Sequence, residues 1–256
     1  MKLNIVPART GMTWVKLGIA TFLKQPLALA GLFFLYMAAI FLLSQIPVIG
    51  PVLASVLMPA CSLGIMVATK EASTGRFPMP ALLVSSFRAG RQRAGATLIL
   101  GVVYAAGWFI ALNVATLLAP PPAPQMVGTA AGQGELGAFY LAVTVLTLPL
   151  TILLWHAPAL VHWHGVTPLK SMFFSFVACF RNLGALTVFA ATWVGIGVVA
   201  LLLIGLVGLL IGATAVLVNI VVPVFLLLLA MFSTSVYFTF RDSFVADEST
   251  PTGEPP

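Results

Sequence analysis

LALAGLFFLYMAAIFLLS, residues 27–44, contains no charged side chain. A bilayer core about 30 Å thick is crossed by an α-helix of about 20 apolar residues, so this stretch predicts a membrane-spanning helix. Pro26 stands at its start, where a missing backbone N–H costs little. The segment SQIPVIGP that follows has no small-x-small cleavage site, and a second apolar run begins at once. We therefore expect a retained helix and not a cleaved signal peptide.

The composition of the whole chain also indicates a membrane protein. Of its 256 residues, 61% are hydrophobic and only 7% are charged, whereas an average soluble domain has about 25% charged residues. A soluble fold could not cover its surface with so few charges. The basic residues lie between apolar runs and form no nucleic-acid-binding motif, so no nucleic-acid partner is expected. The composition predicts an all-α, polytopic membrane protein.

Six apolar runs are long enough to cross the bilayer. The predicted spans are residues 27–44, 52–69, 94–119, 138–161, 183–211 and 215–240. They form three hairpins in a single membrane domain, residues 1–244. We place a turn near Gly212, because one helix over residues 183–240 would be about 87 Å long at 1.5 Å per residue. The acidic tail, residues 245–256, is predicted to be disordered and cytoplasmic.

The charges predict the orientation of these spans. All 12 Lys and Arg residues fall on one side of the six-span layout, and Glu135 is the one charged residue on the other side. Loops rich in Lys and Arg stay in the cytoplasm, and a charge at the centre of a membrane helix costs roughly 2.5–3.5 kcal/mol. We therefore expect both termini in the cytoplasm of a cell with a bacterial-type inner (plasma) membrane.

A short segment precedes each hairpin, at Gly11–Lys24, Pro80–Arg93 and Pro168–Asn182. In the last of these, apolar and polar residues occupy opposite faces of a helix. Such amphipathic helices are predicted to lie in the headgroup layer, with their basic side chains toward anionic lipid. The candidate lipid-headgroup contacts are Lys16, Lys24, Arg88, Arg91, Arg93, Lys170 and Arg181.

Prolines and glycines mark further features of the spans. Pro59, Pro149 and Pro223 lie inside the second span of each hairpin, where a proline removes a backbone hydrogen bond and kinks the helix. Gly205, Gly208 and Gly212 share one face of the fifth span, and the spacing of the last two matches a small-residue packing motif. These glycines predict a close helix contact.

Two longer stretches carry a resemblance to a known group of proteins. They are WHAPALVHWHGVTPLKSMFFSFVACFRNLGAL, Trp155–Leu186, and RTGMTWVKLGIATFLKQPLALAGLFF, Arg9–Phe34. Together they resemble a group of uncharacterised proteobacterial multi-pass inner-membrane families. More distantly, the chain is similar to the membrane domain attached to some glycerophosphodiester phosphodiesterases. The resemblance implies a six-helix inner-membrane protein and no catalytic residues.

Three histidines are the main candidates for metal or haem binding. His156, His162 and His164 lack the i, i+4 spacing of a helical metal pair and have no Cys, Asp or Glu nearby. We interpret them as interfacial residues beside Trp155 and Trp163, while a bound metal or haem stays open as the alternative. All six acidic residues fall in loops or the tail, so we expect no enzyme activity, catalytic residues, cofactor or metal.

Two asparagines are the candidate intramembrane polar sites. Asn113 and Asn219 lie within predicted spans, where an amide either forms hydrogen bonds within the helix bundle or lines a permeation path. The leading hypothesis is a non-enzymatic protein that supports or assembles other membrane components or organises lipids. Its expected partners are anionic membrane lipids and another membrane protein. The alternative is a small-solute or lipid permease subunit.

Overall fold

A computed structural model describes residues 2–211 and 214–245, with the side chains of 211 and 214–218 left out of the description. Two short strands, β1 (Lys2–Leu3) and β2 (Phe244–Val245), form an antiparallel pair. Two 3₁₀ turns lie at Pro80–Val84 and Pro124–Met126. The helices are α1 (Thr10–Lys24), α2 (Pro26–Ser44), α3 (Ile49–Ser73), α4 (Ser85–Arg88), α5 (Arg91–Leu118), α6 (Ala130–Leu154), α7 (Ala157–His164), α8 (Pro168–Arg181), α9 (Leu183–Ile211) and α10 (Thr214–Ser243).

Within the described residues, six helical segments are long and apolar enough to cross a membrane. These segments are Pro26–Ser44, Ile49–Ser73, Arg91–Leu118, Ala130–His164, Leu183–Leu210 and Asn219–Ser243. The all-α, polytopic fold class with six spans is therefore confirmed. The three segments expected before the hairpins contain α1, α4 and α8, respectively. The sequence predicts a disordered tail over residues 245–256, but Val245 lies in strand β2, where it pairs with Lys2. Residues 246–256 and most of the turn at Gly212 lie outside the described residues.

The fourth span differs in detail from the sequence pattern. Helix α6 already begins at Ala130, eight residues before the start of the predicted span 138–161. The side chain of Thr129 explains this start, because its Oγ1 accepts a hydrogen bond from the Gly132 N–H at 3.1 Å and so caps the helix. At the other end, α6 stops at Leu154 and α7 resumes at Ala157.

The contacts within the structure divide the chain into two compact units. Unit 1 contains residues 1–38, 61–85 and 177–256, and unit 2 contains residues 39–60 and 86–176. The boundaries fall inside α2, α3, α4 and α8. The single membrane domain over residues 1–244 stays a prediction.

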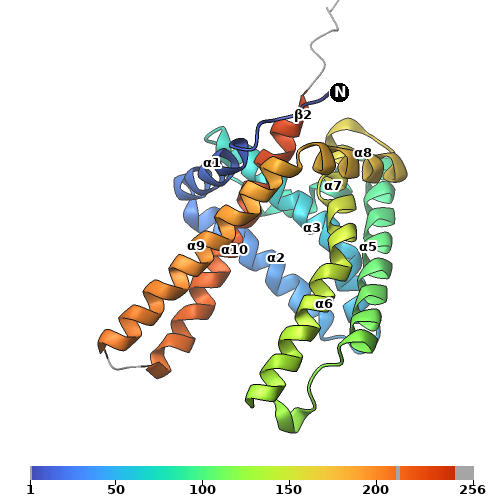
Figure 1. The fold of residues 1–256 in the computed structure, drawn as a ribbon. Coiled ribbons are helices and arrows are strands. Elements are labelled where there is room, and N and C mark those ends of the chain that lie inside the picture. Colours follow the sequence, from blue (N-terminus) through green and yellow to red (C-terminus); the bar gives the residue numbers. More distant parts are fainter. Residues whose placement is uncertain (1, 212–213, 246–256) are drawn as a thin grey trace, which may run out of the picture. The chain divides into compact units, whose positions relative to one another are not determined.

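Unit 1 is built on α1, which packs against α9 and α10 (Figure 1). Glycines allow this close approach, because a Cβ at Gly18 would lie 2.3 Å from the Cβ of Ser235. The face of α1 that we expected to be apolar is buried, and Trp14 is fully enclosed. Its indole N–H donates a hydrogen bond to the Asp242 carboxylate at 2.9 Å. A second core joins Phe22, the start of α2 and the end of α3.

The two ends of the described chain meet in unit 1. Lys2 pairs with Val245, and Leu3 pairs with Phe244. The buried side chain of Asn182 holds this region together. Its Oδ1 accepts from the Val6 N–H at 2.9 Å, and its Nδ2 donates to the Asn4 carbonyl at 3.0 Å and to the Ser243 Oγ at 3.3 Å. Residues 2 and 245 therefore lie at the same end of this unit.

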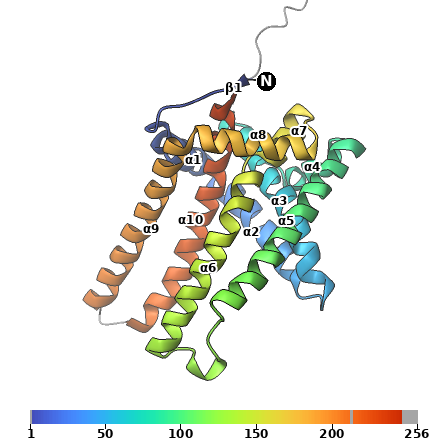
Figure 2. The same cartoon turned by 45° about the vertical axis from the view of Figure 1, so that its right-hand side comes forward.

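Unit 2 is a hairpin of α5 and α6, with α7 also packed against α5 (Figure 2). Its buried core consists of Leu100, Leu154, Ala157 and Val161. On another side of α5, Gly101 lies against α3, since a Cβ there would meet the Val56 carbonyl oxygen at 2.0 Å. This hairpin and the link after α7 position the candidate site.

Candidate functional site

The break between α6 and α7 shapes the site. Pro158 has no backbone N–H, and its ring crowds the carbonyl of Leu154 one turn earlier, which removes a helical hydrogen bond where α6 gives way to α7. Ser175 of α8 bridges the gap: its Oγ accepts a hydrogen bond from the His156 N–H at 3.0 Å and donates one to the Ile152 carbonyl at 2.8 Å. Two backbone groups left by the broken helix thus gain a partner.

A tight turn then redirects the chain from α7 into α8. Gly165 ends α7 with φ at 62°, a left-handed conformation that favours glycine. Its N–H donates to the Val161 carbonyl at 3.1 Å, and the Val166 N–H donates to the Leu160 carbonyl at 3.4 Å. Helix α8 begins at Pro168, three residues after Gly165. Val166 and Thr167 therefore form the link between the two helices.

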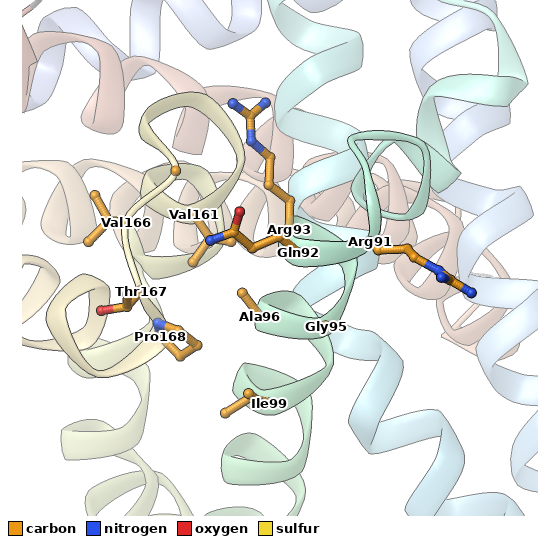
Figure 3. A pocket seen from close by; sticks show the side chains of 11 residues that line it. Arg91, Gln92, Arg93, Gly95, Ala96, Ile99, Val161, Val166, Thr167 and Pro168 are labelled. Carbon is orange, nitrogen blue, oxygen red and sulfur yellow. The ribbon is translucent and has the colours of Figure 1, made fainter.

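A pocket of about 410 Å³ lies between this link and the first turns of α5. Arg91, Gln92, Arg93 and Thr167 supply its polar groups. Figure 3 shows Gln92 projecting from α5 toward the link, with Arg93 and Arg91 extending from the same turn in other directions. The other residues that line the pocket are Gly95, Ala96, Ile99, Val161, Gly165, Val166 and Pro168. The pocket thus combines cationic and amide donors with an apolar wall.

Charge is distributed unevenly along unit 2. Its basic residues are Arg88, Arg91, Arg93 and Lys170, all near the start of α5 or the start of α8. Glu135 is the single acidic residue in residues 39–60 and 86–176, all of which the structure describes. It lies near the start of α6, about 28 Å along the helix axis from Leu154 at 1.5 Å per residue. The pocket end of unit 2 is therefore cationic.

Helix α8 directs its apolar face outward. Leu169 is 78% exposed and Phe173 is 60% exposed, whereas Ser171 and Ser175 are fully buried. The predicted separation of apolar and polar faces is present, and the serines of the polar face pack against the protein. An aromatic face exposed in this way suits a helix that lies at the boundary of headgroups and acyl chains.

Comparison with known proteins identifies the family of the chain. It is 32% identical over 265 aligned positions, which cover 97% of this chain and 96% of the relative, to "Probable inner membrane protein BTH_II0599" of Burkholderia thailandensis. The chain belongs to this inner-membrane protein family. No protein-family model matches the chain, and no solved structure matches it. The expected resemblance to an uncharacterised inner-membrane family is confirmed.

All seven candidate headgroup residues of this inner-membrane protein are exposed. The structure brings two of them, Arg91 and Arg93, together at the pocket. Arg88 lies just before them on α4, and Lys170 lies on the first turn of α8. Lys16, Lys24 and Arg181 belong to unit 1, on α1 and the end of α8. Their binding to lipid stays a prediction.

The two candidate intramembrane asparagines are placed separately, in different units. Asn113 is exposed on α5, and its Nδ2 donates to the carbonyl of Phe109 in the same helix at 2.7 Å. Asn219 is exposed on α10. Neither residue lines the pocket at the start of α5. A permeation path lined by either asparagine stays a prediction.

The histidines flank the break between α6 and α7. His156 is fully buried there, while His162 and His164 lie on α7. Within the part of the chain that the structure describes, no three His, Cys, Asp or Glu side chains gather as metal ligands would.

Sequence reasoning did not identify Gln92, Thr167 or Ser175. The pocket brings together α5 and a link that lies about 70 residues later in the sequence. A local sequence pattern does not predict contacts between segments so far apart in the chain. The one available signal was the pair of serines at positions 171 and 175, which lie on one face of an otherwise aromatic helix. Their spacing indicates that this face makes a polar contact, but it does not indicate which segment of the chain the face contacts.

Proposed function

We propose that this inner-membrane protein is a non-enzymatic component that organises anionic lipid around its basic end. The observation that carries the proposal is the arrangement of α8. This helix buries Ser171 and Ser175 and exposes Leu169, Phe173 and the basic Lys170. An exposed aromatic face next to cationic side chains fits the region where acyl chains meet headgroups.

The charge distribution in each unit supports the same reading. In unit 2, the four basic residues lie at the end opposite Glu135. In unit 1, α1 carries Lys16 and Lys24 and packs near the paired strands, as Trp14 bonds to Asp242 just before β2. Because loops rich in Lys and Arg remain cytoplasmic, we place this basic end and both termini at the cytoplasmic surface.

A non-enzymatic role rests on the residue inventory. The acidic residues outside the tail are Glu71, Glu135 and Asp242. Glu71 pairs with Arg76, and Asp242 pairs with Arg241 and accepts from Trp14. These carboxylates have structural partners, which argues against a pair poised for acid–base catalysis. The distant similarity to the membrane domain of glycerophosphodiester phosphodiesterases stays a prediction and supplies no activity here.

The lipid proposal is tested by the composition of the first lipid shell. The protein is reconstituted into vesicles of phosphatidylcholine and phosphatidylglycerol, and spin-labelled lipids report which headgroup is immobilised at its surface. We expect a preference for phosphatidylglycerol that weakens at high salt, because salt screens exposed charges. The triple variant Arg88→Gln, Arg91→Gln, Arg93→Gln should lose most of this preference for phosphatidylglycerol. Each basic side chain near the surface contributes about 1 kcal/mol to the attraction of anionic lipid.

Glu135→Gln is the control for this experiment, because it alters charge at the opposite end of unit 2. Its lipid preference should equal that of the unaltered protein. An unaltered protein that shows no preference between the two lipids would remove the proposal. In that case, stable co-purification with another membrane protein in mild detergent would favour the scaffold or assembly role.

A further inference from the structure

The pocket at the start of α5 has two chemically different parts. Its rim is lined by Arg91, Gln92 and Arg93, and its wall is lined by Ala96 and Ile99, one and two turns further along the same helix. The wall is open to the surroundings, since Ile99 is 54% exposed. The pocket is therefore lined by hydrogen-bond donors at the start of α5 and by apolar side chains further along this membrane-spanning helix.

The rim matches the chemistry of a phosphate group. Arginine offers several N–H donors in a planar fork that fits two phosphate oxygens at once. Both arginines are exposed, and they extend from the same turn of α5 as Gln92 but in other directions (Figure 3). Binding of one phosphate by both arginines would require rotation of their side chains toward the mouth of the pocket, because Figure 3 shows them extending in other directions. Thr167 adds a hydroxyl from the opposite wall.

The charges of unit 2 provide no carboxylate that could form an ion pair with Arg91 or Arg93. Glu135 is the one carboxylate in the described residues of unit 2, and it lies near the far end of α6. Arg91 and Arg93 thus have no carboxylate of their own unit within reach. An anion from outside would complete the rim.

The wall decides which anion fits. A free phosphate would use the rim alone and leave Ile99, Val161 and Pro168 uncovered. A phospholipid uses both parts, because its phosphate lies at the start of the membrane span and its acyl chain runs along the helix. The volume of about 410 Å³ lies within the usual range of small-ligand pockets, about 300–1,000 Å³, which accommodates a headgroup and the first part of one chain.

We propose that this pocket binds one anionic phospholipid, with its phosphate at Arg91, Gln92 and Arg93 and one acyl chain along Ala96 and Ile99. The site deepens the proposed lipid-organising function and rests on it. Lipids of the surrounding shell exchange freely, whereas this lipid is held by a defined set of side chains and remains with the protein through purification.

Native mass spectrometry tests the stoichiometry. The full chain is reconstituted with phosphatidylglycerol and phosphatidylcholine, extracted in mild detergent, washed, and examined for retained lipid. We expect one retained phosphatidylglycerol per chain. Each arginine near an anionic surface contributes about fivefold in affinity, so the double variant Arg91→Gln, Arg93→Gln should bind this lipid about 30-fold more weakly.

The matched control is Lys16→Gln, Lys24→Gln, which removes the same charge from α1 in unit 1. It should keep the retained lipid. Equal loss of lipid from both double variants would overturn the site and leave general surface attraction, and so would absence of any retained lipid from the unaltered protein. If the spin-label preference for phosphatidylglycerol is also missing, the proposed function fails together with the site.

Two further arms distinguish a lipid from a free phosphate. Ile99→Ser leaves the rim intact and removes part of the wall, so it should weaken retention of phosphatidylglycerol severalfold. Inorganic phosphate in large excess should displace the lipid poorly, because it makes no contact with the wall. Ready displacement by inorganic phosphate, together with unchanged retention in Ile99→Ser, would identify a phosphate site and overturn the lipid assignment. Unchanged melting temperatures of the variants establish that they are folded.

Discussion

Ser175 and His156 are joined by a hydrogen bond of 3.0 Å, from the backbone N–H of His156 to the Oγ of Ser175. The same hydroxyl donates to the Ile152 carbonyl at 2.8 Å. One side chain of α8 thereby connects both sides of the break between α6 and α7. Because water is scarce at this buried position, the bond stabilises the turn that forms the pocket.

The substitution Ser175→Ala should destabilise unit 2. It removes one hydrogen bond to the His156 N–H and one to the Ile152 carbonyl, and each net intramolecular hydrogen bond contributes about 0.5–1.5 kcal/mol. SDS titration in mixed micelles measures the loss. Ser171→Ala is the control on the same helix, since Ser171 is equally buried but bonds only to the Pro168 carbonyl in its own turn. An equal loss in both variants would contradict a bridging role for Ser175.

The substitution Asn182→Ala should release the segment that contains β1. Asn182 holds the Val6 N–H, the Asn4 carbonyl and the Ser243 hydroxyl. Loss of one net hydrogen bond to Val6, about 1.4 kcal/mol at the upper end of the usual range, should speed exchange of the Val6 amide about tenfold. Hydrogen–deuterium exchange with mass spectrometry measures this rate. Asn113→Ala should leave it unchanged, because Asn113 bonds within its own helix.

Two glycines on α5 should respond in opposite directions when alanine replaces them. A Cβ at Gly101 would lie 2.0 Å from the Val56 carbonyl oxygen, so Gly101→Ala should force α3 and α5 apart and cost about 1–3 kcal/mol. A Cβ at Gly95 meets nothing within 4 Å. Gly95→Ala should therefore stabilise the helix by about 0.5–1 kcal/mol. Thermal unfolding in detergent distinguishes the two, and a stabilised Gly101→Ala would refute the close contact.

Hydropathy was sufficient to predict the helices, because each span needs its own run of apolar residues. Helix α9 begins at Leu183 and ends at Ile211, as the sequence indicates. The buried face of α1 was also predictable, since Trp14 and Phe22 share it. Local patterns settle such features because they involve residues within a few turns of each other.

Contacts between distant segments were not predictable from the same patterns. The amphipathic pattern of α8 does not reveal whether its aromatic face or its serine face meets the protein, because lipid accepts the aromatic face as readily as a core does. The close contact predicted from the glycine motif stays a prediction, since Gly208 is buried but no neighbour is described for it. A Cβ at Gly205 would meet nothing within 4 Å, and Gly212 lies outside the described residues. Close approaches lie at Gly18 and at Gly101, where a Cβ would meet Ser235 and the Val56 carbonyl oxygen, respectively.

The proposed orientation places the basic end of unit 2, with Arg91 and Arg93, at the cytoplasmic surface. Cysteine labelling tests this directly, with Arg88→Cys and Glu135→Cys each placed in a variant that lacks Cys61 and Cys179. A membrane-impermeant maleimide is added to cells with a permeable outer membrane. We predict that Glu135→Cys reacts at once and that Arg88→Cys reacts only after the inner membrane is opened. Immediate reaction of Arg88→Cys, with protection of Glu135→Cys, would contradict the orientation on which the proposed function rests.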